Sequence, residues 1–577
     1  MNPKDLDIKF LERNPCEVKC LACDSHKGYY YVSARHFAYH ERVSTYSKCS
    51  KCSSLNLIGG HEDCYKSTLV DEEKRKIYLK YYLEICAGIE QMAEELSSIH
   101  VPTGAVVADV GGGIGLASDF INRTFDKVTS ICFEPNLYGK VPGLNATIIK
   151  LPLDSEWLDN NDMRFDVIYS SEVIEHIGDP IDFLLTLKRA LRNENGVFVM
   201  TTPDADSINQ ESAENMLYSR LFPGEHKCIY SREGIRNLFE RAGFSTPIFS
   251  TRSDTIAFSA STGLSSDSGI SQANPDLYPI YLQSVVTESG FNGGNPYYDG
   301  CTFRLFKYYV NKGDLGSADN LLEKSFVLRG LLEKDCRSIA RTVLTDALEA
   351  VSLDEYVSKV PAFLGPFCFY YSMYSILKYG ENAVSGRNLK IALDVLEHEF
   401  YVSSTHFIEA SSLISPCLRQ LSLTEAVQGF SSSSHDYWMQ SLNYHGDVDQ
   451  VSDELSCILR LIVRHVNNRS YDIVGDMLAI LRSERYDGVG NLFPRLEDMN
   501  IFEIPRSDRR IQGDFYASLI HYSLDASDGL ECRDDFLRLS VAAVSDMLLA
   551  YPDDVSFDYL MPALARGGRF LAAQTTT

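Results

Sequence analysis

The stretch that decides the fold reads Val106-Val107-Ala108-Asp109-Val110-Gly111-Gly112-Gly113-Ile114-Gly115. An apolar segment with one acid leads straight into alternating glycines. Behind the glycines, the apolar residues Leu116, Ala117, Phe120 and Ile121 share one helical face. The pattern predicts a strand, a tight turn and a helix, which is the geometry that presents helix N–H groups and bare backbone to a nucleotide-like ligand.

Length and charge narrow the class of protein. A chain of 577 residues is too long for one hydrophobic core and predicts several domains. A formal net charge of −25 argues against a phosphate-neutralising surface, so we expect no nucleic-acid partner. The sequence shows neither an apolar signal core at its start nor a run of roughly 20 apolar residues, so we expect a cytoplasmic protein without a membrane span.

Two pairs of cysteines stand near the start of the chain. Cys20 and Cys23 form one CxxC pair, and Cys49 and Cys52 form a second. Two such pairs at this separation predict a Cys₄ zinc site in a small module, which we place at residues 1–68. With four thiolate ligands the Zn²⁺ would be structural, because no position stays open for substrate. The alternative is a loop-rich module with four reduced thiols.

Strand and helix patterns alternate beyond this module. A helical pattern covers residues 71–98, and apolar strand patterns follow the glycine turn at 128–133, 165–170 and 196–201, with helical patterns at 181–191 and 232–242. This alternation predicts an α/β, Rossmann-like, doubly wound domain over residues 69–258, including the leading helix. Glu134 follows the second strand directly and is placed to accept the hydroxyls of a bound ribose.

The glycine spacing separates two kinds of nucleotide-binding domain. Dinucleotide oxidoreductases use G-x-G-x-x-G, but the third position falls on Leu116 when counted from Gly111 and on Ser118 when counted from Gly113. The sequence instead reads D-x-G-x-G-x-G from Asp109 to Gly115.

This stretch, Glu134, Phe165-Asp166-Val167-Ile168, Glu172-Val173-Ile174-Glu175-His176-Ile177, Thr202-Pro203-Asp204 and Ala242-Gly243-Phe244 together resemble the class I S-adenosylmethionine-dependent methyltransferases. The resemblance implies S-adenosylmethionine as the methyl donor. It also implies the following cofactor-binding residues: Asp109, Gly111, Gly113, Gly115, Glu134, Asp154, Ser171 and Glu172.

The front module combined with Gly224-Glu225-His226 ahead of Tyr230 is similar to bacterial sugar methyltransferases that act on nucleotide sugars or surface polysaccharides. The sulfonium carries an activated methyl group, so a base is needed only if the acceptor is a hydroxyl or a carbon acid. The resemblance implies Glu225 and His226 for this acid-base work. His176 is a further catalytic candidate, although it could instead shape the pocket or cap a helix.

The C-terminal half carries helical patterns. A Ser- and Gly-rich linker is expected at 259–277 and an all-α region at 278–577, either tetratricopeptide-like or an irregular helical repeat. Apolar stripes on both sides of Lys312-Gly313-Asp314 predict a helical hairpin. Such a region could bind a protein partner, or form a bundle that serves oligomerisation or packs on the methyltransferase domain.

We therefore expect a methyltransferase that acts on a carbohydrate, through oxygen or carbon. One alternative keeps the chemistry with a protein or small metabolite recruited by the helical region. The other is a non-catalytic scaffold that binds S-adenosylmethionine.

Overall fold

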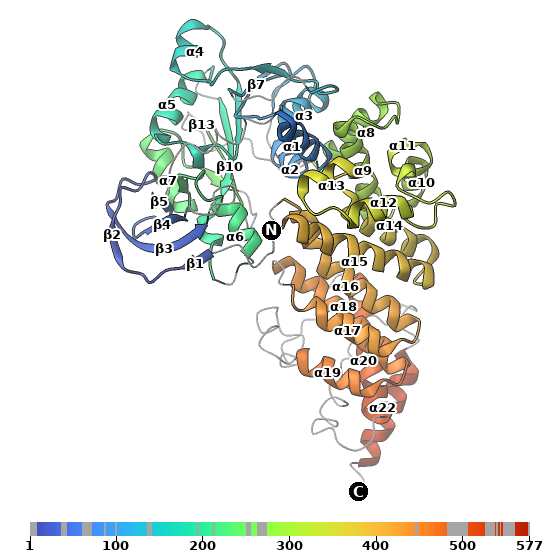
Figure 1. The fold of residues 1–577 in the computed structure, drawn as a ribbon. Helices are drawn as coiled ribbons and strands as arrows, with labels where there is room; N and C mark the ends of the chain where they lie inside the picture. The colour runs from blue at the N-terminus through green and yellow to red at the C-terminus, as the bar shows by residue number, and fades with distance from the viewer. Residues whose placement is uncertain are drawn as a thin grey trace. The chain divides into compact units, whose positions relative to one another are not determined.

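A computed structural model describes residues 8–35, 43–59, 72–85, 88–98, 101–135, 141–192, 196–210, 212, 214–249, 255–261, 274–404, 406–444, 448–481, 506–525, 537, 540–542, 544–545 and 560–574. Figure 1 shows the fold coloured from the N-terminus to the C-terminus. The chain divides into two compact units. The first unit holds residues 1–370 and 398–408, and the second holds 371–397 and 409–577.

A seven-stranded sheet forms the centre of the predicted α/β domain. Its strand order is β12-β13-β10-β9-β6-β7-β8. The strands are β6 (Val106–Val110), β7 (Thr129–Phe133), β8 (Thr147–Ile149), β9 (Val167–Ser171), β10 (Val197–Pro203), β12 (Ile248–Phe249) and β13 (Thr255–Ser261). The five strands from β10 to β8 are parallel, β13 runs antiparallel to β10, and β12 pairs antiparallel with β13 and so runs in the direction of the five. The Rossmann-like fold predicted from the sequence is confirmed.

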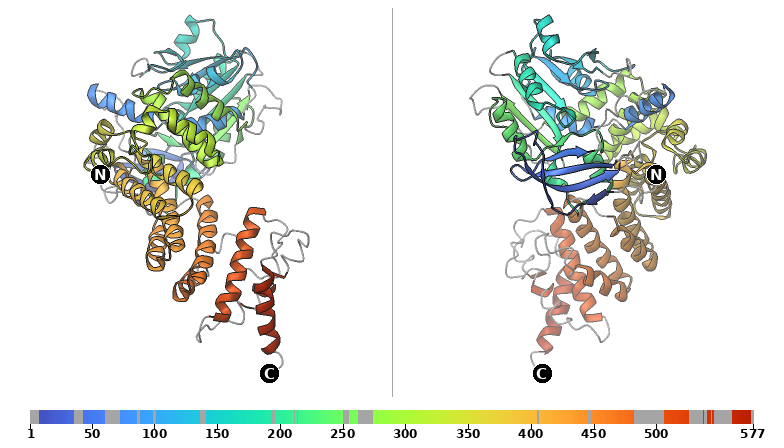
Figure 2. Two further views of the ribbon diagram at one scale, coloured as in Figure 1. Left: turned by 90° about the vertical axis from the view of Figure 1, so that its right-hand side faces the viewer. Right: turned by 60° about the vertical axis from the view of Figure 1, so that its left-hand side comes forward.

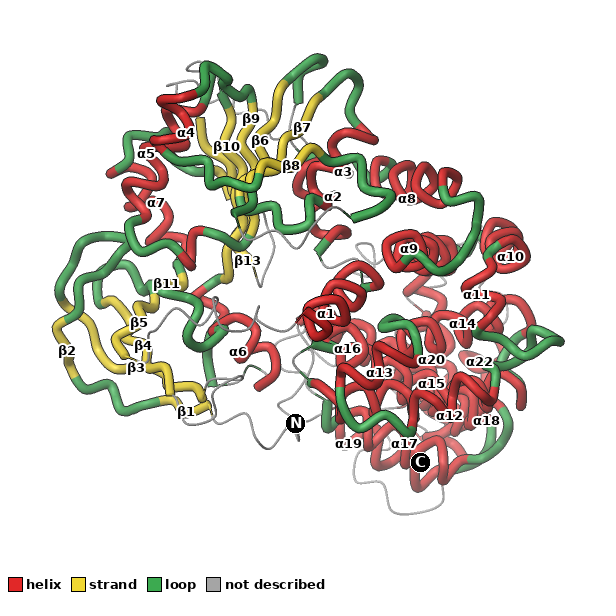
Figure 3. Tube along the Cα trace, turned by 45° about the horizontal axis from the view of Figure 1, so that its top comes forward, coloured by secondary structure: helices red, strands yellow, loops and turns green. Residues whose placement is uncertain are grey.

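Helices cover both faces of this sheet, as a doubly wound fold requires. Figure 3 shows α4 (Ser155–Asn160), α5 (Pro180–Ala190) and α7 (Arg232–Arg241) on one side, with α3 (Leu116–Thr124) on the other. Side-chain caps begin three of these helices: Asp154, Asp179 and Ser231 each accept a hydrogen bond from the backbone N–H three residues ahead.

The segment ahead of the sheet contains two helices where the sequence pattern predicts one. These are α1 (Glu72–Glu84) and α2 (Ile89–Ser97). Gly88 precedes α2 with φ 72°, a left-handed conformation that a continuous helix does not contain. Helix α2 then buries Ile89, Ala93 and Leu96 on one face. The apolar period continues across the break, which is why it suggested a single helix.

The N-terminal module is a second sheet, coloured blue in Figure 2. Its strands are β1 (Ile8–Phe10), β2 (Pro15–Glu17), β3 (Lys27–Arg35), β4 (Val43–Cys49) and β5 (Leu55–Gly59). The sixth strand, β11 (Cys228–Ile229), comes from the α/β domain and pairs antiparallel with β5 (Figure 3). The stretches on either side of the predicted boundary at residue 68 therefore share one sheet.

The helical region begins inside the first unit. Helices α8 (Leu277–Glu288) and α9 (Pro296–Lys312) pack against α1 and α3, and the hydroxyls of Tyr281 and Tyr297 both donate to Asp119 of α3. The predicted hairpin is present, because Gly313 ends α9 with φ 69° and α10 (Leu315–Lys324) follows. Strand β13 runs to Ser261, three residues into the predicted linker, and residues 262–273 of that linker lie outside the described residues.

The remaining helices make the C-terminal region all-α in its described parts. These helices are α11 (Phe326–Gly330), α12 (Arg341–Leu348), α13 (Leu353–Lys359), α14 (Leu364–Tyr379), α15 (Ala383–Ser403), α16 (Ile408–Val427), α17 (Ser431–Ser441), α18 (Val448–Asn467), α19 (Tyr471–Leu481), α20 (Arg506–Asp525) and α22 (Met561–Gln574). A further α-helix, α6 (Glu214–Leu221), precedes β11 in the α/β domain. In the second unit, α18, α19 and α20 surround a core that includes Trp438, Ile462 and Leu519.

Within the described ranges no single helix is long and apolar enough to cross a membrane. The pair α13 and α14, bent by 54°, passes the same test of length and composition only when taken together.

Candidate active site

The site lies where the order of the parallel strands reverses. Strands β6 and β9 are neighbours, but the chain leaves β6 toward β7 and leaves β9 toward β10. Ligands of open α/β sheets bind outside the carboxyl ends of the strands at such a point. The glycine turn follows β6 here, and Glu172 follows β9.

The glycines of the turn are required by backbone conformation and by close approach. Gly111, Gly113 and Gly115 have φ of 71°, 56° and 86°. A Cβ on Gly111 would come within 2.4 Å of Val173 Cγ2, so the turn and the segment after β9 touch at this glycine. A Cβ on Gly113 would meet nothing within 4 Å. The turn therefore leaves a hollow beside Gly113.

Asp109 holds the turn from inside the domain. Its side chain is buried, and Oδ2 accepts hydrogen bonds from the backbone N–H of Ser118 at 3.2 Å and from its hydroxyl at 3.0 Å. Burial raises the pKa of Asp109 to about 6. These contacts fix the start of α3 against the end of β6.

Glu134 faces the same turn from the neighbouring strand. It follows β7 directly, and its Oε2 accepts a hydrogen bond from the backbone N–H of Gly113 at 3.2 Å. A carboxylate beside an open glycine cradle fits the ribose of S-adenosylmethionine, with Gly113 leaving room for the ligand. Glu134 and the glycine turn are thus brought together as the sequence predicted.

Three other predicted cofactor residues already have partners in the fold. Asp154 caps α4 by accepting from the backbone N–H of Trp157 at 2.8 Å. The hydroxyl of Ser171 lies 2.7 Å from that of Thr201, which donates to Glu172 Oε1 at 3.0 Å. Ser171 and Glu172 therefore lie at the carboxyl end of β9, next to the turn. The contact that Asp154 makes caps a helix and is structural. A cofactor role for each of the three stays a prediction.

A carboxylate and two imidazoles meet one turn beyond Glu172. Glu175 Oε1 lies 4.0 Å from His176 Nε2 and 3.9 Å from His226 Nε2. The two imidazole rings are 4.8 Å apart and nearly perpendicular. We call Glu175, His176 and His226 the Glu-His-His cluster. It unites two of the three predicted catalytic residues.

Backbone carbonyls set the orientation of both rings. His226 Nδ1 lies 2.7 Å from the carbonyl oxygen of Arg220, and His176 Nδ1 lies 3.2 Å from that of Glu225. A carbonyl only accepts, so each Nδ1 carries the proton and each Nε2 presents a lone pair. Burial lowers the pKa of both histidines, which keeps the rings neutral.

The third predicted catalytic residue, Glu225, contributes its main chain to the cluster. Its carbonyl oxygen accepts a hydrogen bond from His176 Nδ1, so this contact of Glu225 orients an imidazole ring. A direct catalytic role for its carboxylate stays a prediction.

Glu175 is a candidate that the sequence reasoning missed as a site residue. Its side chain is fully buried, Oε2 accepts from the hydroxyl of Thr202 at 3.1 Å, and Oε1 has no hydrogen-bond partner in the described part of the chain. Burial, and then the charge of Glu172, raise the pKa of Glu175 well above its usual value. The available signal was the position of Glu175 in the sequence, after two apolar residues and directly before His176. An acidic residue is seldom fully buried unless its charge is paired.

The N-terminal module holds the segment that carries His226. The hydroxyl of Tyr46 on β4 lies 2.8 Å from the carbonyl oxygen of Leu221 and 3.3 Å from that of His226. The backbone N–H of Lys227 donates to the carbonyl of Glu175 at 2.7 Å, and β11 then pairs with β5. The cluster is therefore held between the α/β domain and the N-terminal module.

The four predicted zinc ligands converge in this module. Cys20 Sγ lies 3.6 Å from Cys52 Sγ, Cys23 Sγ lies 3.6 Å from Cys49 Sγ, and all four sulfurs lie within 4.8 Å of one another. A disulfide needs about 2.05 Å, whereas tetrahedral zinc with bonds of about 2.3 Å separates its sulfurs by about 3.8 Å. The arrangement fits Zn²⁺.

The two CxxC turns have the same backbone shape. The residue after each pair, Asp24 or Ser53, has φ of 62° or 63° and donates its N–H to the carbonyl of the first cysteine of the pair. Because both turns have this shape, both cysteine pairs can chelate the same ion.

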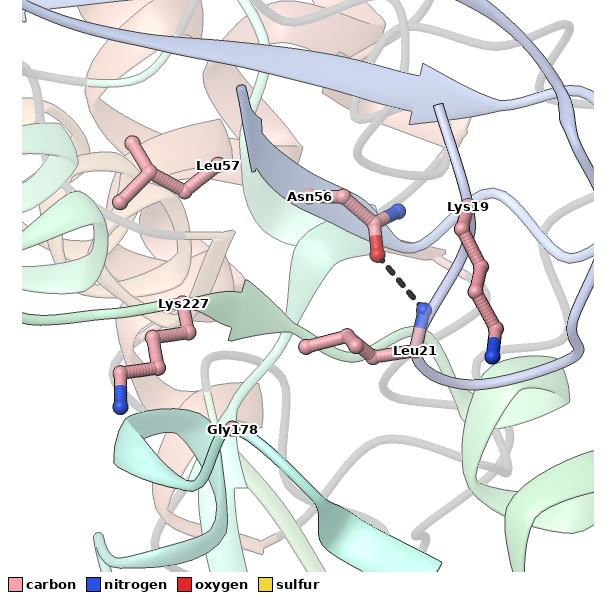
Figure 4. A pocket seen from close by; sticks show the side chains of 6 residues that line it. All are labelled: Lys19, Leu21, Asn56, Leu57, Gly178 and Lys227. Carbon is pink, nitrogen blue, oxygen red and sulfur yellow. Dashed lines mark hydrogen bonds between the residues drawn. The ribbon is translucent and has the colours of Figure 1, made fainter. Parts of the chain in front are cut away.

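A pocket of about 300 Å³ is lined by residues of the N-terminal module and by Gly178 and Lys227, which follow His176 and His226 closely in the chain. Figure 4 shows Lys19 and Lys227 at its opposite ends. The ammonium of Lys227 lies close to the loop after His176, because a Cβ on Gly178 would come within 3.5 Å of Lys227 Nζ. The full lining is Lys19, Leu21, Asn56, Leu57, Gly178 and Lys227.

Comparison with known proteins agrees with this geometry. Residues 76–246 match the family model described as a methyltransferase domain. The chain is 33% identical over 144 residues to a tRNA U34 carboxymethyltransferase of Campylobacter jejuni subsp. doylei, covering 24% of this chain and 48% of the relative. It is 26% identical over 135 residues to the mitochondrial ubiquinone biosynthesis O-methyltransferase of Dictyostelium discoideum, covering 20% and 42%.

Among solved structures, the chain is similar to the plantazolicin methyltransferase BpumL in complex with SAH, with 17% identity, coverage of 34% and 93%, and a TM-score of 0.26. A complex of the Haloferax volcanii Trm112 methyltransferase activator with a methyltransferase shows 13% identity, coverage of 35% and 99%, and a TM-score of 0.26. The chain spans about half the length of the curated relatives that it matches. Residues 76–246 are thus a class I S-adenosylmethionine-dependent methyltransferase domain.

Proposed function

We propose that this protein transfers a methyl group from S-adenosylmethionine to an acceptor that must lose a proton, namely a sugar hydroxyl or a sugar carbon. The observation that carries the proposal is the position of the Glu-His-His cluster. Val173, in contact with Gly111, lies two residues before Glu175, so the glycine turn and the cluster share one short segment.

The cofactor would rest on the glycine turn. Gly111, Gly113 and Gly115 allow close approach, and Glu134 would bind the ribose hydroxyls. S-adenosylmethionine supplies a methyl group on a sulfonium, an already activated leaving group. The protein then has to align the acceptor, exclude water and assist loss of the acceptor's proton.

The cluster is suited to that last task. His176 Nε2 and His226 Nε2 present lone pairs in a site of low solvent exposure, and neutral imidazole is the side chain that most often accepts a proton near neutral pH. The side chain of His176 is 30% exposed and that of His226 is 6% exposed, so an acceptor would approach from the His176 side.

The pocket of about 300 Å³ supports a nucleotide sugar as the acceptor. Lys19 and Lys227 give it positive charge in a chain of net charge −25, and ammonium groups bind phosphate oxygens. Lys19 also pairs with Asp24 at 3.2 Å. A protein or small-metabolite acceptor, or a scaffold role without catalysis, would use the same cofactor site without needing this pocket.

The acceptor test is transfer of labelled methyl from S-adenosylmethionine to nucleotide sugars, glycans and small metabolites. We expect labelling of a nucleotide sugar, with His226→Ala lowering kcat by about 10²-fold or more. Lys227→Ala should raise the KM of that acceptor while leaving the affinity for S-adenosylmethionine unchanged. Labelling only of metabolites that are not sugars would overturn the carbohydrate assignment.

The cofactor test is calorimetric binding of S-adenosylmethionine. Glu134→Ala should weaken binding at least 10-fold, since it removes the carboxylate beside Gly113. Glu156→Ala, an exposed acid on α4, is the matched control and should bind normally. Absence of binding to the wild-type protein would refute every catalytic version of the proposal.

We also propose that Cys20, Cys23, Cys49 and Cys52 hold a structural Zn²⁺ ion. Metal analysis of the purified protein should find one zinc per chain. Cys52→Ser should lose it and melt at a lower temperature, whereas Cys336→Ser, an exposed cysteine far along the chain, should retain it. Less than half a zinc per wild-type chain would contradict the site.

A further inference from the structure

A second group of possible metal ligands lies in the Glu-His-His cluster itself. Glu175 Oε1, His176 Nε2 and His226 Nε2 lie within 4.8 Å of one another. The two distances from the carboxylate oxygen, 3.9 and 4.0 Å, are too long for hydrogen bonds. Neighbouring ligands of one ion lie about 3.0–3.4 Å apart when each bond is about 2.1 Å, so each imidazole would move toward the carboxylate by about 1 Å or less to share an ion with it.

The two Nε2 atoms are acceptors, and Glu175 Oε1 becomes one when its carboxyl gives up a proton to make room for a bound cation. Both imidazoles have their protons on Nδ1, fixed by the carbonyls of Arg220 and Glu225. Glu175 Oε1 is fully buried, and within the described residues no donor reaches it. Three acceptors that converge without a donor leave a place for a cation.

The surroundings have the form of a metal site. Metal-bound histidines usually donate the second ring N–H to a carbonyl or carboxylate, which fixes the ring and its tautomer. Both histidines do so here, and Thr202 donates to the other oxygen of Glu175 at 3.1 Å. Two imidazoles and one carboxylate on one side of an ion, with other positions open, is a recurring set for divalent first-row metals.

We propose that Glu175, His176 and His226 bind a divalent transition-metal cation at the acceptor site. The ion would be reached from the side of His176, whose side chain is the most exposed of the three. Its role rests on the function proposed above: an acceptor hydroxyl bound to the ion becomes more acidic and releases its proton to water. The imidazoles then act as ligands, with no proton passing to them.

The test is titration of the full-length, zinc-loaded protein with Mn²⁺, with free Mn²⁺ counted by electron paramagnetic resonance. Mn²⁺ prefers oxygen and nitrogen ligands, so it should not displace zinc from the four cysteines. We expect one Mn²⁺ per chain. Glu175→Gln and His226→Gln should each weaken Mn²⁺ binding at least 10-fold.

Matched controls separate loss of the site from loss of the fold. His398→Gln changes a histidine that contacts the carbonyl of Ala350, and it should bind Mn²⁺ like the wild type. His176→Gln, at the more exposed ligand, keeps the test valid if the buried variants unfold. Calorimetric binding of S-adenosylmethionine reports whether each variant retains its methyltransferase domain.

The outcomes distinguish the metal from the methyl transfer. A wild-type protein that binds no Mn²⁺, or a His176→Gln variant that binds it equally well, overturns the metal site. If labelled methyl transfer persists in either case, the function proposed above survives with the imidazoles acting directly as bases. Stoichiometric Mn²⁺ binding that depends on the three ligands supports the site even if no acceptor has yet been identified.

Discussion

The hydroxyl of Tyr46, in the N-terminal module, lies 3.3 Å from the carbonyl oxygen of His226, in the methyltransferase domain. The same hydroxyl lies 2.8 Å from the carbonyl of Leu221, and the tyrosine is fully buried. One side chain of the module thus anchors both ends of the segment that delivers His226 to its cluster.

Tyr46→Phe should therefore affect turnover more than cofactor binding. The change leaves buried carbonyls without their donor, at a cost of about 1–3 kcal/mol in the free energy of unfolding. With the His226 segment loosened, kcat should fall several-fold at an unchanged Kd for S-adenosylmethionine. Steady-state kinetics and calorimetry measure the two effects, and an unchanged kcat would show that the anchor has no functional role.

Gly111→Ala should disrupt the contact between the glycine turn and the segment after β9. The new methyl group would lie 2.4 Å from Val173 Cγ2 at a residue with φ 71°. We expect a lower melting temperature and loss of S-adenosylmethionine binding. Gly104→Ala, with φ 80° but nothing within 4 Å of the new carbon, isolates the backbone strain of about 1 kcal/mol. Equal behaviour of the two variants would contradict the role assigned to Gly111.

Asp119→Ala should destabilise the first unit strongly. Asp119 is fully buried, pairs with Arg123 Nε at 2.8 Å and accepts from the hydroxyls of Tyr281 and Tyr297, so its loss leaves a poorly compensated charge. We expect a cost of about 3–5 kcal/mol, measured as a lower melting temperature. Glu288→Ala removes only the half-exposed partner of Arg123 and should cost about 0–1 kcal/mol. If Asp119→Ala and Glu288→Ala have the same melting temperature, the packing of helices α8 and α9 does not depend on Asp119.

Glu84 should make stability depend on pH. Burial raises its pKa from 4.5 to about 7, so the folded protein favours the protonated carboxyl. This contribution is complete below pH 4.5 and is lost as the pH rises to about 7, by up to about 3 kcal/mol at roughly 1.4 kcal/mol per pKa unit. The Glu84→Gln variant has no carboxyl group at this position, so this pH dependence is absent from its stability.

Denaturant unfolding at pH 5 and pH 8 tests this expectation. Between pH 5 and pH 8 the wild type should lose free energy of unfolding that Glu84→Gln keeps, so the variant should become more stable relative to the wild type at pH 8. An equal difference at both pH values would mean that Glu84 is not desolvated in the folded protein.

Much of the cofactor side could be predicted from the sequence. The glycines of the turn are dictated by positive φ angles, and Glu134 by its place one strand further on. The two CxxC pairs predict the four cysteine ligands, because each chelating turn is formed by residues that are neighbours in the sequence. The catalytic side was only partly predictable: His176 and His226 were singled out, whereas Glu175, which faces both, was not.

The sequence by itself determined the α/β domain and the two cysteine turns, because strand and helix periods, backbone conformation and chelate spacing are local properties of neighbouring residues. Only the tertiary structure decided that Glu175 faces His226, that β11 completes the sheet of the N-terminal module, and that α8 and α9 close over Asp119. Those contacts join segments far apart in the chain. They follow from burying shared apolar faces, and no local pattern of residues specifies which distant segment supplies the other half.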